Sequence, residues 1–264
     1  MQNGEYITDR LLPGMVRQAC ERHGVSYQAL SDDWALCLEQ SGAVRWVFGY
    51  KFDINLAAAA SVAQDKVAAY QILAASGIRA MPHVLARSVP GDTLPVEILL
   101  QTFGNKSVVM KPLTGTGGKG VTLYADVGRA IQALATKAEP AWAISPYYDI
   151  AAEFRIVVLG GEVVAAYEKT NPVMRNGLKF FNLGMGAVAR DIDPDPELRK
   201  LALSAAAAVS LNLAAVDIIR TEAGGYCILE INDGIMMENY ARQSPEYEKS
   251  AIVLYDAIVT HMFS

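Results

Sequence analysis

The chain has 264 residues, of which 52% are hydrophobic and 19% are charged, a composition typical of a globular protein with one large domain or two to three small ones. Its 23 basic and 28 acidic residues leave a net charge of −5, which argues against nucleic acid or an anionic membrane surface as the main partner. The three cysteines and three histidines follow no zinc or disulfide spacing. Because the first ten residues are polar and the apolar stretches are short, we expect a cytoplasmic protein.

The first sixty residues predict a small α/β unit without a catalytic pattern. Thr8 or Asp9 can cap a helix that runs to about His23, and Gly24 lies just beyond the helix end. A strand and a hairpin with a turn at Ser41-Gly42 follow, at residues 25–30, 35–39 and 44–48.

Residues 57–76 predict one continuous helix, because their apolar positions recur at helical spacing up to Ser76-Gly77. The linker 86–95 contains Pro, Gly and Asp and is predicted to be a flexible joint. The other elements predicted in this half are a helix at 96–103, strands at 106–111 and 121–124, and a helix at 127–136.

Two further hairpins follow, and their turns predict which residues face each other. The first joins strands 154–159 and 162–167 through Gly160-Gly161, and the second joins 214–221 and 226–232 through a turn at Ala223-Gly224. The remaining segments are an irregular stretch at 170–193 and helices at about 196–210 and 245–262.

A glycine-rich stretch follows the strand that ends at Lys111. Gly115, Gly117 and Gly120 match G-x-G-x-x-G, but a dinucleotide fold needs a helix directly after this loop, and residues 121–124 favour a strand. The stretch also lacks the Walker pattern. We therefore interpret it as a hairpin loop whose backbone amides can close over phosphate oxygens, with a mobile surface turn as the alternative.

Lys66 and Lys111 are candidate phosphate ligands. Either one alone is more often a solvated surface charge. A triphosphate beneath the glycine loop would need positive charge from more than one side, and the two lysines together would supply it.

Acidic and amide side chains share one face of the second hairpin. Glu230 and Asn232 lie two residues apart on a strand, and a tight turn at Ala223-Gly224 places Asp217 opposite Glu230. Two facing carboxylates repel unless positive charge lies between them, and this oxygen set is the one that Mg²⁺ or Mn²⁺ prefers. The alternative, solvated charges on an exposed strand, fits poorly because the neighbouring residues are apolar.

In this order, the helix lysine, the strand lysine with its glycine loop, and the Asp…Glu-x-Asn hairpin resemble the ATP-grasp superfamily, most closely its RimK-like amino-acid and peptide ligases. D-alanine–D-alanine ligase and glutathione synthetase are more distant relatives. The resemblance covers roughly residues 57–264 and implies an α/β (α+β) protein in which two α+β subdomains grip ATP. It implies a short pre-ATP-grasp-like domain at 1–60 and an ATP-grasp domain at 61–264, with a lid at about 82–143 and a metal-binding subdomain at about 144–264.

The resemblance also implies roles for individual residues. Lys66 and Lys111 would contact ATP phosphates, and Asp217, Glu230 and Asn232 would hold Mg²⁺ or Mn²⁺. The implied lid and the implied adenine hinge consist of Gly115, Thr116, Gly117, Gly118 and Gly120, and of Ser145, Pro146, Tyr147 and Tyr148.

Arg155 lies in a segment that resembles the one from which the family places an arginine near the reacting groups. The Gly160-Gly161 turn predicts that Arg155 faces Ala166 and lies diagonal to Glu168, so a purely structural Arg155–Glu168 pair is the alternative. In the irregular stretch, Lys169, Lys179 and Asn182 lie where such ligases place phosphate and substrate contacts.

The implied reaction is the ATP-dependent joining of a carboxylate to an amine through an acyl phosphate, on an amino acid or a peptide. A non-catalytic nucleotide-binding module, a phosphotransferase on the same fold and a dinucleotide-dependent oxidoreductase are the alternatives. The sequence departs from the family at Ser145-Pro146, where many relatives have an acidic residue, and at Phe180-Phe181. Because the preceding domain is short, a homodimer or a partner protein is a candidate to complete the substrate pocket.

Overall fold

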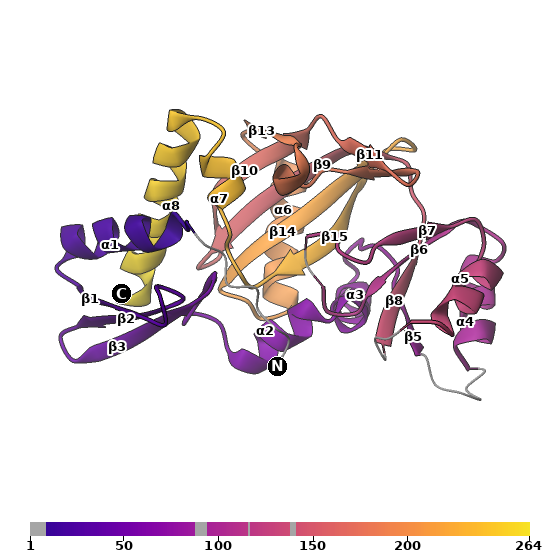
Figure 1. The fold of residues 1–264 in the computed structure, drawn as a ribbon, viewed down its shortest axis with the longest axis horizontal. Coiled ribbons are helices and arrows are strands. Elements are labelled where there is room, and N and C mark those ends of the chain that lie inside the picture. Colours follow the sequence, from indigo (N-terminus) through magenta and orange to yellow (C-terminus); the bar gives the residue numbers. More distant parts are fainter. Residues whose placement is uncertain (1–8, 88–93, 116, 138–140) are drawn as a thin grey trace.

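The computed structural model describes residues 9–87, 94–115, 117–137 and 141–264. Figure 1 shows three regions along the long axis: an N-terminal sheet at one end, a five-stranded sheet in the centre and a second four-stranded sheet at the other end. In the described ranges, no helix combines the length and the apolar character needed to cross a membrane.

The N-terminal unit confirms the predicted helix and hairpin. Its elements are α1 (Leu12–His23), β1 (Ser26–Leu30), β2 (Ala35–Gln40), β3 (Ala43–Phe48) and β4 (Lys51–Phe52). Gln40 pairs with Ala43, and Ser41 and Gly42 between them have φ of 52° and 82°, as a two-residue hairpin turn requires. Gly24 ends α1 in the left-handed region, with φ of 65°.

The predicted start of the first helix is wrong. The helix begins at Leu12, Asp9 does not cap it, and Thr8 lies outside the described residues. The backbone N–H groups of Leu11 and Leu12 donate instead to the carboxylate of Glu238, at 2.8 and 3.2 Å. A distant acidic side chain therefore satisfies the first amides of α1 and complements the positive end of its dipole.

The single helix predicted over 57–76 is also wrong, because it is broken at Asp65. The structure has α2 (Ala57–Gln64) and α3 (Lys66–Ala75), and Asp65 between them is extended, with φ of −81° and ψ of 104°. The Asp65 carboxylate accepts hydrogen bonds from the N–H groups of Val67 and Ala68, both at 2.9 Å. This N-cap starts a new helix with Lys66 as its first residue.

A four-stranded antiparallel sheet forms the region drawn at the right of Figure 1. Its strand order is β5-β8-β6-β7, with β5 (Val84–Arg87), β6 (Val108–Pro112), β7 (Thr122–Tyr124) and β8 (Ala141–Pro146). Two helices, α4 (Leu94–Phe103) and α5 (Val127–Leu134), cover one face of this sheet. Neither β5 nor β8 was predicted from the sequence. The predicted joint at 86–95 contains the end of β5 and the start of α4, and residues 88–93 lie outside the described residues.

The alternation of this sheet decides which residues it offers to the rest of the protein. Val108, Met110, Trp142 and Ile144 point to α4 and α5 and form one apolar core with them. Lys111 pairs with Ala143 one step out of phase, so its side chain projects from the opposite face. We call this opposite face the inner face.

The central sheet has the strand order β13-β10-β9-β14-β15. Its strands are β9 (Ile150–Leu159), β10 (Glu162–Thr170), β13 (Val188–Asp191), β14 (Leu213–Thr221) and β15 (Tyr226–Asn232). The stretch 170–193, predicted to be irregular, contains a short hairpin of β11 (Val173–Arg175) and β12 (Leu178–Phe180). The 3-10 turn η1 (Leu183–Met185) and strand β13 follow. The last helices are α6 (Pro196–Ala208), α7 (Glu238–Ala241) and α8 (Pro245–Met262).

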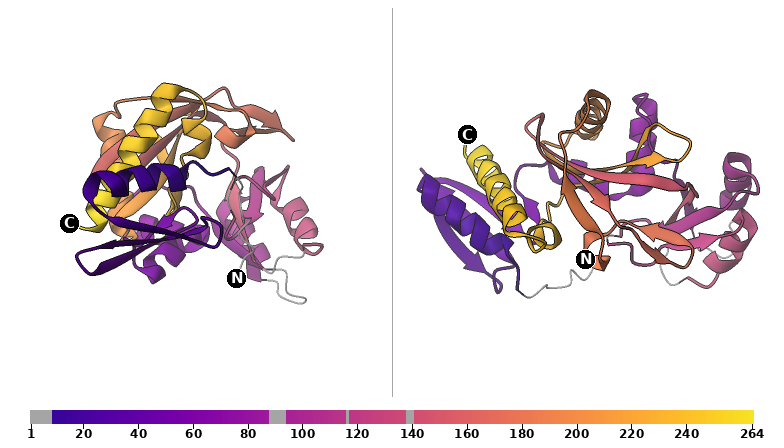
Figure 2. Two further views of the ribbon diagram at one scale, coloured as in Figure 1. Left: turned by 60° about the vertical axis from the view of Figure 1, so that its left-hand side comes forward. Right: turned by 90° about the horizontal axis from the view of Figure 1, so that it is seen from above.

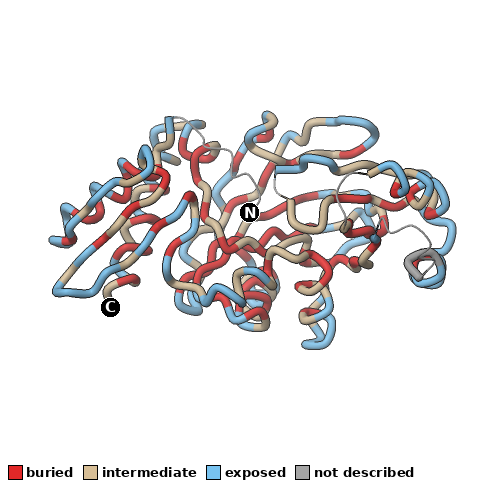
Figure 3. Tube along the Cα trace, turned by 60° about the horizontal axis from the view of Figure 1, so that its bottom comes forward, coloured by how far each residue is buried: buried red, intermediate tan, exposed pale blue. Residues whose placement is uncertain are grey.

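The two faces of the central sheet have different partners. Phe154, Ile156 and Val158 of β9 pack with α6, whereas Val157 and Leu159 share a core with α7, α8 and the N-terminal unit. Figure 2 shows α1 and α8 side by side, and Figure 3 shows buried residues gathered in the middle of the molecule. Along β9 and β14 the buried residues form nearly unbroken runs. The division into domains at residue 60 stays a prediction.

Bulges change both predicted hairpin registers. In β14–β15, Ile218 pairs with Ile228, and a bulge then places Asp217 opposite Glu230, so that predicted pairing is confirmed. In β9–β10, a bulge between Val163 and Ala165 moves Arg155 opposite Tyr167. The predicted Arg155–Ala166 pairing is therefore wrong.

Candidate functional site

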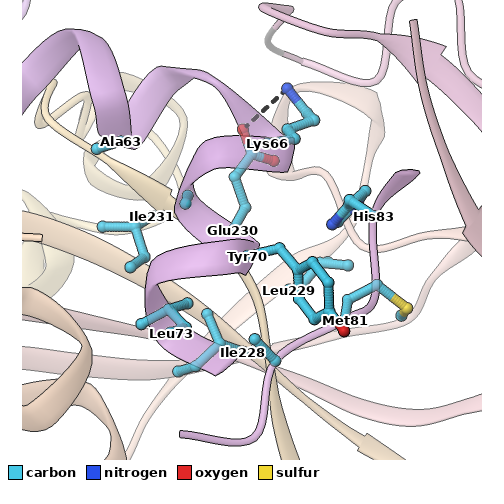
Figure 4. Close-up of a pocket in the computed structure, with 12 residues that line it drawn as sticks. Ala63, Lys66, Tyr70, Leu73, Met81, His83, Ile228, Leu229, Glu230 and Ile231 are labelled. Atoms are coloured by element: carbon cyan, nitrogen blue, oxygen red, sulfur yellow. Dashed lines mark ion pairs between the residues drawn. The ribbon is translucent and has the colours of Figure 1, made fainter. Parts of the chain in front are cut away.

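The candidate site lies between the central sheet and the inner face of the β5-β8-β6-β7 sheet. A small pocket there is lined by α3, by the segment before β5 and by β15. Figure 4 shows Lys66 and Tyr70 from α3, His83 from the segment before β5, and Glu230 from β15 around this pocket.

Lys66 connects three separate elements of the site. Its side chain is 6% exposed, its Nζ donates to the Gly115 carbonyl at 2.8 Å, and the same Nζ lies 3.7 Å from Glu230 Oε1. The N-cap at Asp65 places this lysine at the first turn of α3. The structure thus brings the predicted helix lysine, glycine loop and acidic strand together.

Lys111 projects from the inner face and is 9% exposed. Burial lowers the pKa of its ammonium from 10.5 to about 8; Glu230 opposes this change and the charge of Lys66 adds to it. A buried ammonium beside a second lysine is a position that an anion would stabilise.

The glycine loop joins β6 to β7, as predicted. A strand, not a helix, follows Gly120, which contradicts a dinucleotide-binding unit at this loop. Gly117, Gly118 and Gly120 have φ of 68°, 74° and 73°, and a Cβ at Gly120 would lie 2.9 Å from Pro112 Cγ. Thr116 lies outside the described residues.

The loop also leans on the segment after β11. A Cβ on Gly118 would lie 3.0 Å from the ring of Phe180, and one on Gly117 would lie 3.9 Å from Asn182 Nδ2. Asn182 Oδ1 itself accepts from the N–H of Gly184 at 2.8 Å and so starts η1. Asn182 is therefore beside the loop, as its predicted role requires.

Asp217 is the centre of a buried charge network. Arg155 donates to it through Nε at 3.0 Å and through a second nitrogen at 2.6 Å, and Lys169 Nζ donates at 2.7 Å. Asn232 Nδ2 adds a contact at 3.3 Å. Although burial alone would raise the pKa of the Asp217 carboxyl, Arg155 and Lys169 outweigh it and lower this pKa to about 2.

The alternative of a structural Arg155–Glu168 pair is wrong. Arg155 pairs with Asp217, and Glu168 pairs with Arg190. The β9–β10 bulge is the physical reason, because it changes the register between these strands. The positive charge expected near the facing carboxylates is thus supplied by the protein itself.

Glu153 belongs to the same network, although no role was predicted for it from the sequence. Its carboxylate accepts from Lys169 Nζ at 2.6 Å, and burial raises its pKa in spite of this partner. It occurs two residues before Arg155 on β9, so both side chains point to the same face. That spacing is the signal that could have identified it.

The donor set fits a hard divalent cation in type. Asp217, Glu230 and Asn232 place two carboxylates and an amide on adjoining strands, although no group of three His, Cys, Asp or Glu suited to a metal occurs in the described part of the chain. Four donor contacts already reach the two Asp217 oxygens, which is about their full capacity. A cation on Asp217 would therefore require one of these donors to move.

The other predicted contacts lie at the edges of this region. Ser145 and Pro146 end β8 and are buried, whereas Tyr148 is exposed; the N–H of Tyr147 donates to the Ser107 carbonyl at 2.9 Å. Lys179 donates to Asp149 at 2.6 Å and to the Ile150 carbonyl at 2.9 Å, at the start of β9. Its described contacts do not reach Asp217 or the lysines, so its catalytic role stays a prediction.

Comparison with known proteins points to one family. The model of the RimK-like ATP-grasp domain matches residues 63–249, more than half of the chain. A probable alpha-L-glutamate ligase of Pseudoalteromonas translucida (strain TAC 125) is 33% identical over 194 residues, which are 71% of this chain and 61% of that protein. One of Parasynechococcus marenigrum (strain WH8102) is 33% identical over 190 residues, 70% of this chain and 39% of that protein.

The solved structures show the fold alone. The crystal structure of the D-cycloserine synthetase DcsG superposes with a TM-score of 0.58 at 23% identity, over 75% of this chain and 71% of that one. D-alanine–D-alanine ligase from Bacillus anthracis superposes with a TM-score of 0.58 at 16% identity, over 80% and 72%. The chain spans about two fifths to three fifths of the length of the curated relatives that it matches.

Proposed function

Because this chain belongs to the RimK-like ATP-grasp family, we propose that it is an ATP-dependent ligase that joins a carboxylate to an amine and so forms an amide or peptide bond. The observation that carries the proposal is the contact of Lys66 with both Gly115 and Glu230, beside the buried Lys111. These groups come from three distant segments and converge on one place with the charges that a nucleotide tail needs.

In this proposal the chain holds ATP from three sides. Lys66 and Lys111 neutralise phosphate oxygens, and the amides of the glycine loop, Gly115 to Gly120 with Thr116, donate to them. The hinge from Ser145 through Pro146 and Tyr147 to Tyr148 holds the adenine through backbone groups. Closure of the loop excludes water from the reacting groups.

Glu230, Asn232 and Asp217 are the residues that would hold Mg²⁺ or Mn²⁺, which would screen the charge of the phosphates when bound. Arg155 and Lys169 donate hydrogen bonds to Asp217. In this proposal they give up these bonds and bind an incoming anion instead. Lys179 and Asn182 are proposed to orient substrate or phosphate from the β12 side.

The reaction begins with attack of the substrate carboxylate oxygen on the γ-phosphorus of ATP. The bond from this phosphorus to the bridging oxygen breaks, which releases ADP and leaves an acyl phosphate. The amine then attacks the acyl carbon, phosphate leaves, and the amine loses a proton as the amide forms. Arg155 and Lys169 supply positive charge next to these anions.

The relatives are probable alpha-L-glutamate ligases, which favours an amino acid as substrate, with glutamate first to be tested. We propose the domain division given by the sequence, with residues 1–60 as the N-terminal unit, a lid at about 82–143 and a metal-binding part at about 144–264. A second subunit or a partner protein that completes the substrate pocket, and a cytoplasmic location, stay predictions.

The test is the release of ADP and phosphate by the purified protein with ATP, Mg²⁺ and a pool of amino acids and peptides, followed by mass spectrometry of the product. A ligase requires both substrates and yields an amide. Phosphate that stays on the acceptor would instead indicate a phosphotransferase, and nucleotide binding without ADP release would indicate a binding module.

Glu230→Gln is the sharper variant for this test. It is expected to abolish turnover, because it removes a proposed metal ligand. The fold should stay intact, because Glu230 is partly exposed and has one loose ion pair. Asp217→Asn also removes the partner of two buried cations, so its effect on turnover would be mixed with a loss of stability. Glu162→Gln, at an exposed strand end, is the matched control; full activity of Glu230→Gln would remove the proposed metal site.

A further inference from the structure

His83 is a buried polar side chain whose Nε2 has no hydrogen-bond partner among the described residues. The residue is 4% exposed and lines the pocket shared by Lys66 and Glu230. Figure 4 shows its ring facing the space between Lys66 and Tyr70. A buried nitrogen without a partner is costly, so a group that enters this pocket and satisfies it would bind more tightly.

The backbone places His83 at the crossing between the two sheets. Before it, the N–H of Met81 donates to the Ile228 carbonyl of β15 at 2.7 Å. After it, Val84 pairs with Ile144 of β8. Continuing this antiparallel register by one residue sets His83 beside Ser145, on the inner face that also carries Lys111.

The hydrogen bonding of the ring defines what Nε2 can do. The ring makes a hydrogen bond with the backbone of Met81, and this bond raises the pKa of His83. A ring N–H is therefore the donor and the Met81 carbonyl is the acceptor. Since Nε2 has no partner among the described residues, we assign this bond to Nδ1–H and the Met81 carbonyl, which leaves Nε2 of the neutral ring as an acceptor.

The surroundings keep the ring neutral. Burial, and then the charges of Lys111 and Lys66, lower the pKa of His83 well below its usual value. Glu230 from β15 and Tyr70 from α3 are the other titratable groups around the pocket, and Tyr70 meets the His83 ring edge-on, with the ring centres 6.5 Å apart.

We propose that His83 Nε2 accepts a hydrogen bond from the exocyclic amino group of the nucleotide base, so that His83 selects adenine over 6-oxo purines. The inference rests on the proposed function, which places the base at the hinge that contains Ser145. Adenine presents an amino donor at carbon 6, whereas hypoxanthine and guanine present a carbonyl acceptor there. Two acceptors facing each other in a dry site leave both without a partner, which is a strong basis for discrimination.

The experiment measures binding of ATP and of inosine triphosphate by calorimetry, with no acceptor substrate present. The unmodified protein is expected to bind ATP about tenfold or more tightly than inosine triphosphate, as one hydrogen bond to a buried acceptor allows. His83→Leu is expected to weaken ATP binding about tenfold and to leave inosine triphosphate binding nearly unchanged, which removes the preference. Tyr70→Phe is the control, because it preserves the ring against His83 and should keep the preference.

His83→Gln provides a second reading, since its amide oxygen can accept the same bond and should restore part of the preference even if the leucine variant folds poorly. The role of His83 in selecting adenine would be overturned if His83→Leu lost affinity equally for both nucleotides, or if this variant still preferred ATP. Either result would leave the proposed function in place. If the unmodified protein binds neither nucleotide, the proposed function fails and the inference fails with it.

Discussion

Replacing Lys111 with methionine is expected to stabilise the protein and, at the same time, to weaken its binding of ATP. The side chain is 9% exposed, and burial lowers the pKa of its ammonium from 10.5 to about 8. At roughly 1.4 kcal/mol per pH unit, this difference corresponds to at most about 3 kcal/mol of stability that the buried charge costs the folded chain. Methionine keeps the length of the side chain without the charge.

The sign of the pH dependence follows from the same values. The folded pKa of Lys111, about 8, lies below the unfolded 10.5, so the unfolded chain binds more protons between these values. The cost is therefore complete below pH 8 and disappears as the pH rises toward 10.5. The stability advantage of Lys111→Met should be largest at pH 7 and about 1 kcal/mol smaller at pH 9.

Urea unfolding of both proteins at pH 7 and pH 9 measures this advantage, and calorimetry with ATP measures the loss of binding. Lys106→Met is the matched control, because Lys106 is exposed just before β6 and should change stability by less than about 0.5 kcal/mol. A Lys111→Met variant that is less stable at pH 7, or whose advantage is the same at both pH values, would refute the picture of a desolvated ammonium held ready for an anion.

Three further changes test the structure around the site. Asp65→Ala should cost about 1 kcal/mol in urea unfolding, because it removes the N-cap of α3, and Asp65→Asn should keep most of it. Lys169→Met should cost about 3–5 kcal/mol, because it leaves the buried carboxylates of Asp217 and Glu153 without their shared ammonium. Gly120→Ala should cost about 1–3 kcal/mol in the same assay, because φ is 73° and the new Cβ would lie 2.9 Å from Pro112.

Each of these three predictions would be contradicted by a particular result. Equal stabilities of Asp65→Ala and Asp65→Asn would mean that the side-chain bonds do not hold the start of α3. A neutral Lys169→Met would show that the carboxylates lie apart or are protonated. Gly104→Ala has a similar φ, 58°, but open space around the new Cβ, so an equal cost at Gly104 and Gly120 would exclude the contact with Pro112 as a cause.

The loop, the lysines and the acidic hairpin could be placed from the sequence because short-range chemistry decides them. The strand pattern after Gly120 identified a hairpin loop, which the pairing of Val109 with Leu123 confirms. The turn near Gly224 and the alternation along the strand predicted Asp217 opposite Glu230, and this pairing is found because a bulge between Asp217 and Ile218 offsets a turn register that pairs Ile218 with Ile228. Both pairs lie no more than 14 positions apart in the chain.

Bulges and long-range partners explain the failures. The β9–β10 bulge changed the pairing of Arg155, and no turn residue signals a bulge inside a strand. The N-terminal amides of α1 bond to Glu238, more than two hundred positions away, and the predicted cap at Asp9 was wrong for this reason. Asp65 was assigned to a helix interior because its neighbours are good helix formers, although its side chain ends one helix and starts another.

By itself, the sequence determined which chemical groups the protein has and their order: two lysines, a glycine loop and an acidic strand pair. Only the tertiary structure decided their partners, namely that Asp217 is held by Arg155 and Lys169 and that His83 Nε2, near the lysines, has no hydrogen-bond partner among the described residues. The physical reason is range. Turn and helix preferences act over a few residues, whereas a buried charge or a buried ring nitrogen takes its state from whichever distant segments exclude water around it.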